Sequence, residues 1–135
     1  MKNKLGEIDV LEASCNIDTV RDGRGAIFTW VPEDVIREFN MVFFLPGKVR
    51  GNHYHPEFVE YFLVADGSVV MVTVDKEGKE VNMLAGRGTC FRIPPNTPHA
   101  VHAIVQSLCI ALLTKPWDDC NPPIRRENVL GDVLA

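Results

Sequence analysis

Short runs of apolar and β-branched residues, separated by turn-forming residues, fill the middle of the chain. The runs have the length and composition of strands, and the turns between them are rich in Gly, Pro and Asp. Strands that recur every ~8–12 residues indicate a β-sandwich or barrel. The predicted strands are Phe39–Leu45, Val49–His55, Phe58–Ala65, Ser68–Val74, Glu80–Leu84, Thr89–Ile93, His99–Val105 and Leu108–Thr114. The chain is therefore predicted to be all-β.

The same pattern predicts some of the connections and the ends of the fold. Asp66-Gly67 lies between two of these runs and is typical of a tight hairpin. Pro32–Glu38 is a helix candidate with proline in its first turn, but it is too short to build an α/β fold. From Pro116 to Ala135 the chain is rich in proline and charge, so we expect an extended arm over the surface.

Composition restricts the fold and the partners. A chain of 135 residues is expected to form a single domain, residues 1–135. With 46% hydrophobic and 24% charged residues, it has the composition of an ordinary globular protein and not of a disordered one. Its formal net charge is −4, so it lacks the basic surface that nucleic acids and anionic membranes attract. We expect neither nucleic acid nor membrane as a partner.

Targeting and redox features predict a cytoplasmic protein. No stretch approaches the ~20 apolar residues of a membrane span. Acidic residues interrupt the N-terminal segment, which therefore lacks the apolar region of a signal peptide. The cysteines, Cys15, Cys90, Cys109 and Cys120, are widely spaced and form no CxxC pair, so reduced thiols are expected. Cys90 and Cys109 lie in apolar runs and are expected in the core.

The histidines fall in two clusters, each on a predicted strand. Residues i and i+2 of a strand face the same side, so His53 and His55 are expected to project together. If the next strand returns as a hairpin, Glu60 reaches the same face, and His99 can add a third imidazole from a facing strand. His102 follows His99 by three residues and is expected on the opposite side. An HxH pair alone is a weak sign of metal, but imidazoles joined by a carboxylate are a set of divalent-metal ligands.

The spacing of these residues resembles the two motifs of the cupin superfamily. The first motif reads Gly, five residues, HxH, three or four residues, Glu, six residues, Gly. The second reads Gly, five residues, Pro, any residue, Gly, two residues, His, three residues, Asn. The matching positions are Gly47, His53, His55, Glu60 and Gly67 in the first motif and Gly88, Pro94 and His99 in the second. Asn96 and Ala103 replace the inner glycine and the final asparagine of the second motif.

The cupin resemblance covers about residues 39–114, which form the motif-bearing core. It implies a double-stranded β-helix, that is, a jelly-roll barrel of two sheets. It also implies one divalent metal ion, with Zn, Fe, Mn and Ni all acceptable to such ligands. The implied ligands are His53, His55, Glu60 and His99. Phe62 and Val64 share the strand parity of Glu60 and are expected to line the pocket.

A finer resemblance concerns function. The segment from Arg50 to His55, RGNHYH, is similar to the RGxHxH/Q segment of cupins in nucleotide-sugar metabolism. These include enzymes like dTDP-4-dehydrorhamnose 3,5-epimerase and the cupin domain of capsular-polysaccharide proteins. The segment 22–28, DGRGAIF, is similar to one that opens several such enzymes, which makes Arg24 a candidate for substrate binding. In that family the histidine matching His53 is a base, and the arginine matching Arg50 contacts phosphates.

The resemblance therefore implies an isomerase or epimerase that removes a proton next to the carbonyl of a keto sugar, which is expected to be nucleotide-linked. His53 and Arg50 are the implied catalytic residues, and Arg50, Phe62 and Arg24 the implied substrate-binding residues. A non-catalytic small-molecule-binding module and a metal-dependent dioxygenase are the alternatives.

Two departures from the epimerase pattern keep these alternatives open. Metal-free epimerases usually have Gln at the position of His55, and a metal-bound His53 is not a base. Tyr54 and Tyr61 are expected to face away from the ligands, so no tyrosine is assigned as a general acid.

Apolar residues on outer faces predict a homodimer. Phe39, Val42, Phe43 and Tyr61 are available for such faces. Trp117, at the start of the arm, can either cover the mouth of the barrel or lie in an interface.

Overall fold

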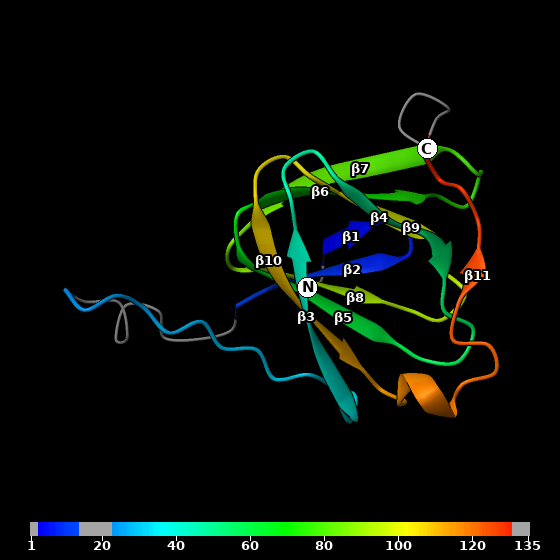
Figure 1. Ribbon diagram of the computed structural model, residues 1–135, viewed down its shortest axis with the longest axis horizontal. Coiled ribbons are helices and arrows are strands. Elements are labelled where there is room, and N and C mark those ends of the chain that lie inside the picture. The colour runs from blue at the N-terminus through cyan, green and yellow to red at the C-terminus, as the bar shows by residue number, and fades with distance from the viewer. Residues whose placement is uncertain (1–2, 14–22, 131–135) are drawn as a thin grey trace.

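The computed structural model describes residues 3–13 and 23–130 and consists of antiparallel strands (Figure 1). The elements are β1 (Asn3–Leu5), β2 (Ile8–Glu12), β3 (Glu38–Phe44), β4 (Val49–Tyr54), β5 (Glu60–Asp66), β6 (Ser68–Val74), β7 (Glu80–Gly86), β8 (Thr89–Ile93), β9 (His99–Ala103), β10 (Ser107–Leu113), the 3-10 turn η1 (Trp117–Asp119) and β11 (Arg125–Arg126). Each predicted strand is present, with ends that agree to within two residues.

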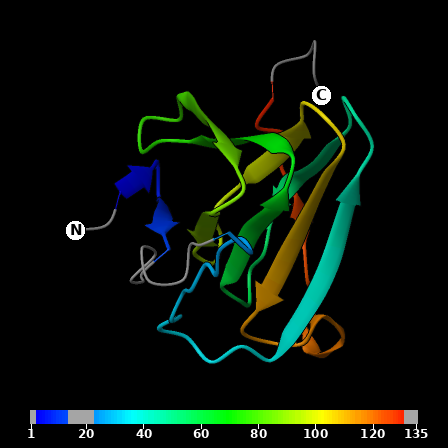
Figure 2. The same ribbon diagram turned by 90° about the vertical axis from the view of Figure 1, so that its left-hand side faces the viewer.

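The strands form two sheets that face each other (Figure 2). One is six-stranded, in the order β1-β2-β8-β5-β10-β3, and the other is five-stranded, in the order β11-β4-β9-β6-β7. Strands that are consecutive in the sequence often lie in different sheets, which is the arrangement of a jelly roll. The predicted all-β jelly roll is therefore confirmed.

The predicted hairpin at Asp66-Gly67 is wrong, because β5 and β6 belong to different sheets. Gly67 instead forms a corner where the chain crosses from one sheet to the other. Its φ is +96°, and a Cβ there would lie 2.2 Å from Ser107 Oγ. The Ser107 hydroxyl in turn accepts a hydrogen bond from the Ser68 amide at 3.1 Å. The turn therefore requires glycine, as the sequence indicated, but the turn connects two sheets and not two paired strands of a hairpin.

The predicted helix over Pro32–Glu38 is also wrong, since residues 31–37 are not helical. The Asp34 carboxylate accepts a hydrogen bond from Arg92 Nε at 2.8 Å and one from the Tyr61 hydroxyl at 2.5 Å. The Arg37 amide already donates to the Leu113 carbonyl, which continues the ladder of β3. A single helical turn is marginal on its own, so these tertiary contacts determine the conformation of the segment.

The sequence pattern did not predict β1, β2 or β11. Charged residues interrupt the apolar ones in β2, although Ile8 and Val10 are buried. Asp9, between them, is buried as well and forms an ion pair with Lys4 at 2.8 Å. β2 therefore pairs with β8 and closes one side of the six-stranded sheet.

The hydrophobic core fills part of the space between the sheets. Val64 is fully buried in it and does not line the pocket, contrary to the prediction. Phe44 and Phe62 meet edge to face, with ring centroids 6.4 Å apart, and both also border the cavity described below. These two rings thus separate the packed core from the cavity.

The core cysteines behave as the sequence predicts. Cys90, Cys109 and Cys120 are free thiols, and Cys15 lies outside the described residues. Burial raises the pKa of both Cys90 and Cys109 to about 12, so these thiols are unreactive at neutral pH.

The described part of the chain contains no helix long and apolar enough to cross a membrane.

Candidate functional site

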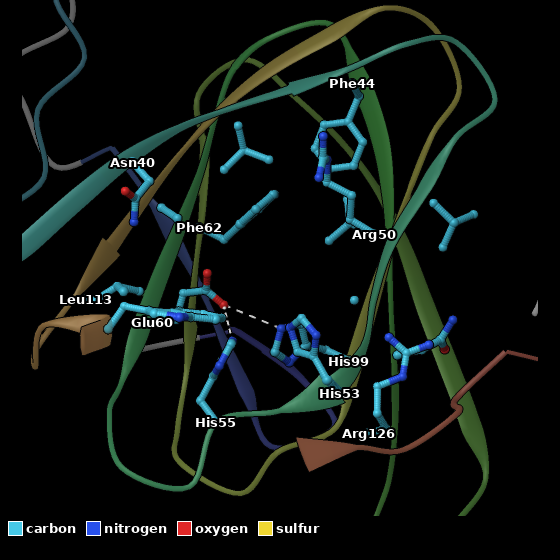
Figure 3. Close-up of a pocket in the computed structure, with 17 residues that line it drawn as sticks. Asn40, Phe44, Arg50, His53, His55, Glu60, Phe62, His99, Leu113 and Arg126 are labelled. Atoms are coloured by element: carbon cyan, nitrogen blue, oxygen red, sulfur yellow. Dashed lines mark hydrogen bonds and ion pairs between the residues drawn. The ribbon is translucent and has the colours of Figure 1, made fainter. Parts of the chain in front are cut away.

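A cavity of about 560 Å³ opens between the two sheets beside the core (Figure 3). Its walls come from β3, β4, β5, β9 and β10, together with η1 and β11 of the C-terminal segment. The predicted ligand residues, His53, His55, Glu60 and His99, all line it. Its volume is in the range of sites that bind small molecules.

A bulge in β4 brings Arg50 and His53 to the same face. A regular strand would put two residues three positions apart on opposite faces. The register between β4 and β9 shifts between Gly51 and His53, so that Asn52 is an extra residue. Gly51 has a φ of +103° and Asn52 a φ of +57°. Both Arg50 and His53 therefore line the cavity.

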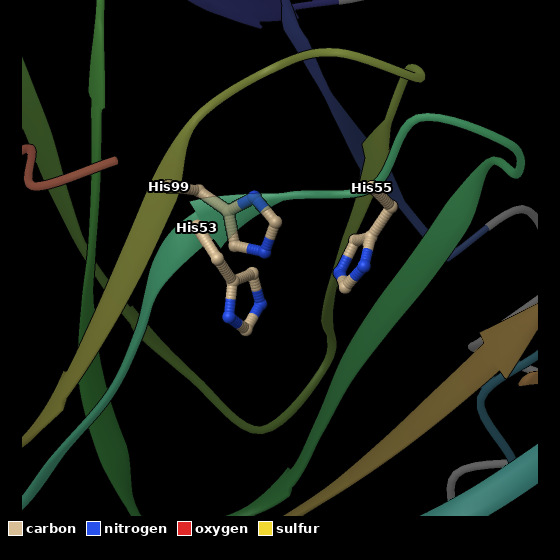
Figure 4. A group of neighbouring side chains, drawn as sticks. All are labelled: His53, His55 and His99. Carbon is tan, nitrogen blue, oxygen red and sulfur yellow. The ribbon is translucent and has the colours of Figure 1, made fainter. Parts of the chain in front are cut away.

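The three imidazoles converge, as Figure 4 shows. The rings of His53 and His55 have centroids 4.7 Å apart, as expected for neighbours on one face. His99 lies on β9 directly beside His53 in the same sheet and not on a facing strand as predicted. One nitrogen from each ring lies within 4.8 Å of the others.

Glu60 reaches this cluster from the opposite sheet. The predicted hairpin return is wrong, because β4 and β5 belong to different sheets. The Glu60 carboxylate nevertheless lies 3.1 Å from His55 Nε2 and 3.4 Å from His99 Nε2. The four residues that the sequence grouped together are therefore adjacent in space.

Hydrogen bonds to the backbone determine which ring nitrogens face the cluster. His55 Nδ1 lies 3.1 Å from the Pro123 carbonyl oxygen, and His99 Nδ1 lies 2.9 Å from that of Thr97. A carbonyl can only accept, so each Nδ1 donates its proton, and a neutral ring then presents an Nε2 lone pair. Both Nε2 atoms point at the Glu60 carboxylate. Lone pairs facing a carboxylate need a cation between them, either a proton or a metal ion.

The electrostatics of the cluster also suit a cation. Burial alone would raise the pKa of the Glu60 carboxyl, but its close interactions with the His55 and His99 rings outweigh burial and hold that pKa far below its usual range. Burial, followed by the charges of His99 and His55, lowers the pKa of His53 to about 4. At neutral pH the cavity thus contains a charged carboxylate beside a neutral His53.

His53 differs from the other two histidines in its surroundings. Its ring makes no hydrogen bond with any residue that the structure describes. Histidines that bind a metal almost always donate their second ring N–H to an acceptor. His55 and His99 have such an acceptor, and His53 has none among residues 3–13 and 23–130.

The predicted substrate-binding residues divide into two groups. Arg50 and Phe62 line the cavity. Arg50 Nη2 donates to the Phe43 carbonyl at 3.2 Å, and its guanidinium carbon lies 5.5 Å from the centre of the Phe44 ring. Arg24 lies in an exposed turn and does not line the cavity, while Asp22 of the same motif lies outside the described residues.

Three other aromatic side chains lie as the strand parity predicts. Tyr54, Tyr61 and His102 do not line the cavity. Tyr61 instead points outward, where its hydroxyl donates to Asp34.

Sequence reasoning missed Arg126, Asn40 and Asn52 as cavity residues, whereas it gave Trp117 a place over the mouth of the barrel as one of two alternatives. Trp117 and Arg126 line the cavity, as do Asn40 and Asn52 from β3 and β4. The Trp117 ring lies 6.2 Å from that of His55, so it covers the barrel interior. A charged, proline-rich tail carries no periodic pattern. The position of Arg126 in the cavity wall becomes clear from the pairing of β11 with β4.

Comparison with known families identifies the fold. The family model of the cupin domain matches residues 40–113. The chain belongs to the cupin family. No curated protein matches this cupin in a sequence search.

Solved structures similar to this cupin include sugar-nucleotide enzymes. The dTDP-4-dehydrorhamnose 3,5-epimerase from Sulfolobus tokodaii is 25% identical with a TM-score of 0.69, over 85% of this chain and 74% of that chain. A 3,4-ketoisomerase from Helicobacter canadensis is 16% identical with a TM-score of 0.74, over 90% of this chain and 92% of that chain. The sugar 3,4-ketoisomerase from Thermoanaerobacterium thermosaccharolyticum, solved with TDP, is 13% identical with a TM-score of 0.70, over 89% of this chain and 88% of that chain.

Proposed function

We propose that this cupin is an isomerase or epimerase that acts on a nucleotide-linked keto sugar by removing a proton next to the carbonyl. The observation that carries the proposal is the contrast between His53, whose ring has no hydrogen-bond partner among the described residues, and the fixed group formed by His55, Glu60 and His99. Similarity to the Sulfolobus tokodaii epimerase supports the choice of substrate class.

His53 acts as the base in this proposal. Its neutral ring lines the cavity and can accept a proton from a carbon atom held in front of it. Arg50 and Phe62 line the same cavity, where an arginine can bind anionic groups of the substrate and an aromatic ring can pack against the sugar. Trp117 lines the cavity on the side of the C-terminal segment.

His55, His99 and Glu60 would hold a divalent metal ion. Two Nε2 lone pairs and a carboxylate oxygen converge, and both imidazoles have a backbone carbonyl behind them, so the donor set fits such an ion. When bound, the metal supplies a Lewis acid for the oxygen atom that becomes negative as the proton leaves. His53 is then left out of the ligand set that the family resemblance implies.

Proton exchange in deuterated water tests the proposal. Wild-type protein with dTDP-4-dehydrorhamnose should exchange the carbon-bound hydrogen next to the keto group, as followed by NMR. His53→Gln should slow this exchange about 100-fold or more, because positioned acid–base groups contribute roughly that much. His102→Gln, which changes a histidine that does not line the cavity, serves as the control. Absence of exchange by the wild type with a panel of keto-sugar nucleotides would contradict the proposal.

We further propose that the protein is a homodimer formed through the outer face of β3. The side chains of Phe39, Met41 and Phe43 are exposed by 75%, 72% and 48% on one edge strand. Val42, which the sequence assigned to an outer face, lines the cavity, and Tyr61 is buried under Asp34. Such a row of apolar side chains on an edge strand is typical of an association surface.

Light scattering tests the dimer. Wild-type protein should have the mass of two chains, and Met41→Lys should shift it to one chain because a charge would be buried in the interface. Leu84→Lys changes a residue of the other sheet that is 63% exposed, and this variant should remain a dimer. A monomeric wild type would refute the interface.

A further inference from the structure

The C-terminal segment contributes a guanidinium to the wall of the cavity. β11 pairs with β4, and Arg126 lies opposite His53 in the register. Residues directly opposite each other on antiparallel strands point to the same face, so Arg126 points into the cavity with His53 (Figure 3). Arg125 lies opposite Tyr54 and belongs to the other face, and it does not line the cavity.

Hydrogen bonds and apolar contacts hold the chain in place on the C-terminal side of Arg126. The Glu127 amide donates to the Asn52 carbonyl at 3.0 Å, and the Val129 amide donates to Asn52 Oδ1 at 3.1 Å. Val129 and Leu130 are buried in a small cluster with residues of the five-stranded sheet. The backbone that carries Arg126 is therefore held in place before any ligand binds, which lowers the entropic cost of binding.

Arg126 has no negatively charged partner in the part of the chain that the structure describes. It forms no ion pair with any described residue. Arg50 is the other arginine among the described residues that line the cavity, and Glu60 is the one carboxylate there, already engaged by His55 and His99. Arg50 and Arg126 thus line the main cavity from the same sheet, and no described carboxylate there pairs with them. Glu127 is a carboxylate of the smaller cavity, so the main-cavity side of Arg126 is the side suited to a multiply charged anion.

A second, smaller cavity begins where Arg126 lies. It has a volume of about 260 Å³ and is lined by Asn52, Arg126, Glu127 and Asn128. Asn52 and Arg126 line both cavities, so Arg126 stands at their junction. A ligand whose charged group joins two uncharged parts matches this arrangement, with one part at the histidines and the other in the smaller cavity.

We propose that Arg126 binds the diphosphate of a nucleotide-linked substrate, with the sugar in the main cavity and the nucleoside directed toward Asn128. This inference rests on the proposed function and adds a substrate-binding residue and a direction for the ligand. The Oδ1 atoms of Asn52 and Asn128 accept hydrogen bonds from the Val129 and Leu130 amides, and their side-chain NH2 groups supply donors suited to a ribose or a base.

Calorimetric titration with two probes, thymidine diphosphate and inorganic pyrophosphate, tests the assignment. Arg126→Gln should weaken the binding of both probes by about 10-fold or more, because it removes a charge-assisted contact to phosphate. Arg125→Gln makes the same change of charge one residue away and should alter either affinity less than about 2-fold, since its side chain belongs to the opposite face. Circular dichroism would confirm that both variants are folded.

Three outcomes would overturn the inference: equal weakening by both variants, no weakening by Arg126→Gln, or no binding of either probe by the wild type. Weakening of thymidine diphosphate alone would place Arg126 on the nucleoside and would also overturn it. The proposed function fails separately, by absence of proton exchange, and in that case a measured Arg126 effect would stand as a property of a nucleotide-binding module.

Discussion

Gly51→Ala is expected to destabilise the protein by roughly 3 kcal/mol and to abolish activity in any molecules that still fold. Gly51 has a φ of +103°, which side-chain-bearing residues rarely adopt. A Cβ at this position would lie 2.8 Å from the His99 carbonyl oxygen and 2.9 Å from Ala100 Cα. Both neighbours are backbone atoms of the adjacent strand, so β4 and β9 would have to separate, and His53 and His99 would separate with them.

Chemical denaturation and the exchange assay measure this effect. Two other glycines provide controls. Gly78 also has a positive φ, +78°, and no atom lies within 4 Å of the Cβ that Gly78→Ala adds, so this variant reports backbone strain alone. Gly23→Ala meets nothing within 4 Å and carries no such strain. Gly51→Ala should be the most destabilising of the three, and equal effects for Gly51→Ala and Gly78→Ala would show that the close approach of the strands does not matter.

Glu60→Gln is expected to weaken metal binding by about 100-fold or more while leaving the apo protein folded. Loss of an outer-shell partner alone typically costs 10- to 100-fold in affinity, and Glu60 is proposed as a direct ligand. The glutamine amide can donate a hydrogen bond to the Nε2 lone pair of His55 or His99, which the carboxylate cannot do without a cation. The free energy of unfolding without metal should therefore change by no more than ~1 kcal/mol.

Elemental analysis of purified variants gives the measurement. Wild-type protein should carry about one equivalent of a divalent metal. His99→Ala should lose it, as should Glu60→Gln, whereas His53→Gln should retain it. Glu57→Gln removes the same charge from a residue outside the cavity that pairs with Lys115, and should also retain the metal. Loss of metal in His53→Gln would return His53 to the ligand set and argue against its role as the base.

The parts of the site that follow from local periodicity could be predicted from the sequence. His53 lies in β4 and His55 directly follows its last residue, and Tyr61 alternates with Glu60 and Phe62, so their faces follow from the pleat. The motif spacing grouped Glu60 and His99 with them without showing how they meet. That Glu60 comes from the opposite sheet depends on which strands pair, and non-local packing decides the pairing.

Other features could not be predicted from the sequence, because they interrupt the two-residue alternation of a strand or are too short to show it. The bulge at Asn52 reverses the parity of Arg50 relative to His53, and a one-residue insertion leaves no pattern in composition. β11 contains two residues, Arg125 and Arg126, which is too short for an alternation to appear. The 32–38 segment contains a proline start typical of a helix, but its ion pair with Arg92 depends on a residue far away in the sequence.

The division of the site between the two sheets has a consequence for how the protein responds to its surroundings. Of the proposed ligands, Glu60 belongs to the six-stranded sheet, whereas His99 belongs to the five-stranded one. A cation held by both would act as a cross-link between the layers. By mass action, each tenfold rise of free metal above its Kd would then add about 1.4 kcal/mol to the stability of the folded state. The melting temperature would thus depend on the free metal concentration, and a chelator would remove the metal and lower the stability of the folded protein.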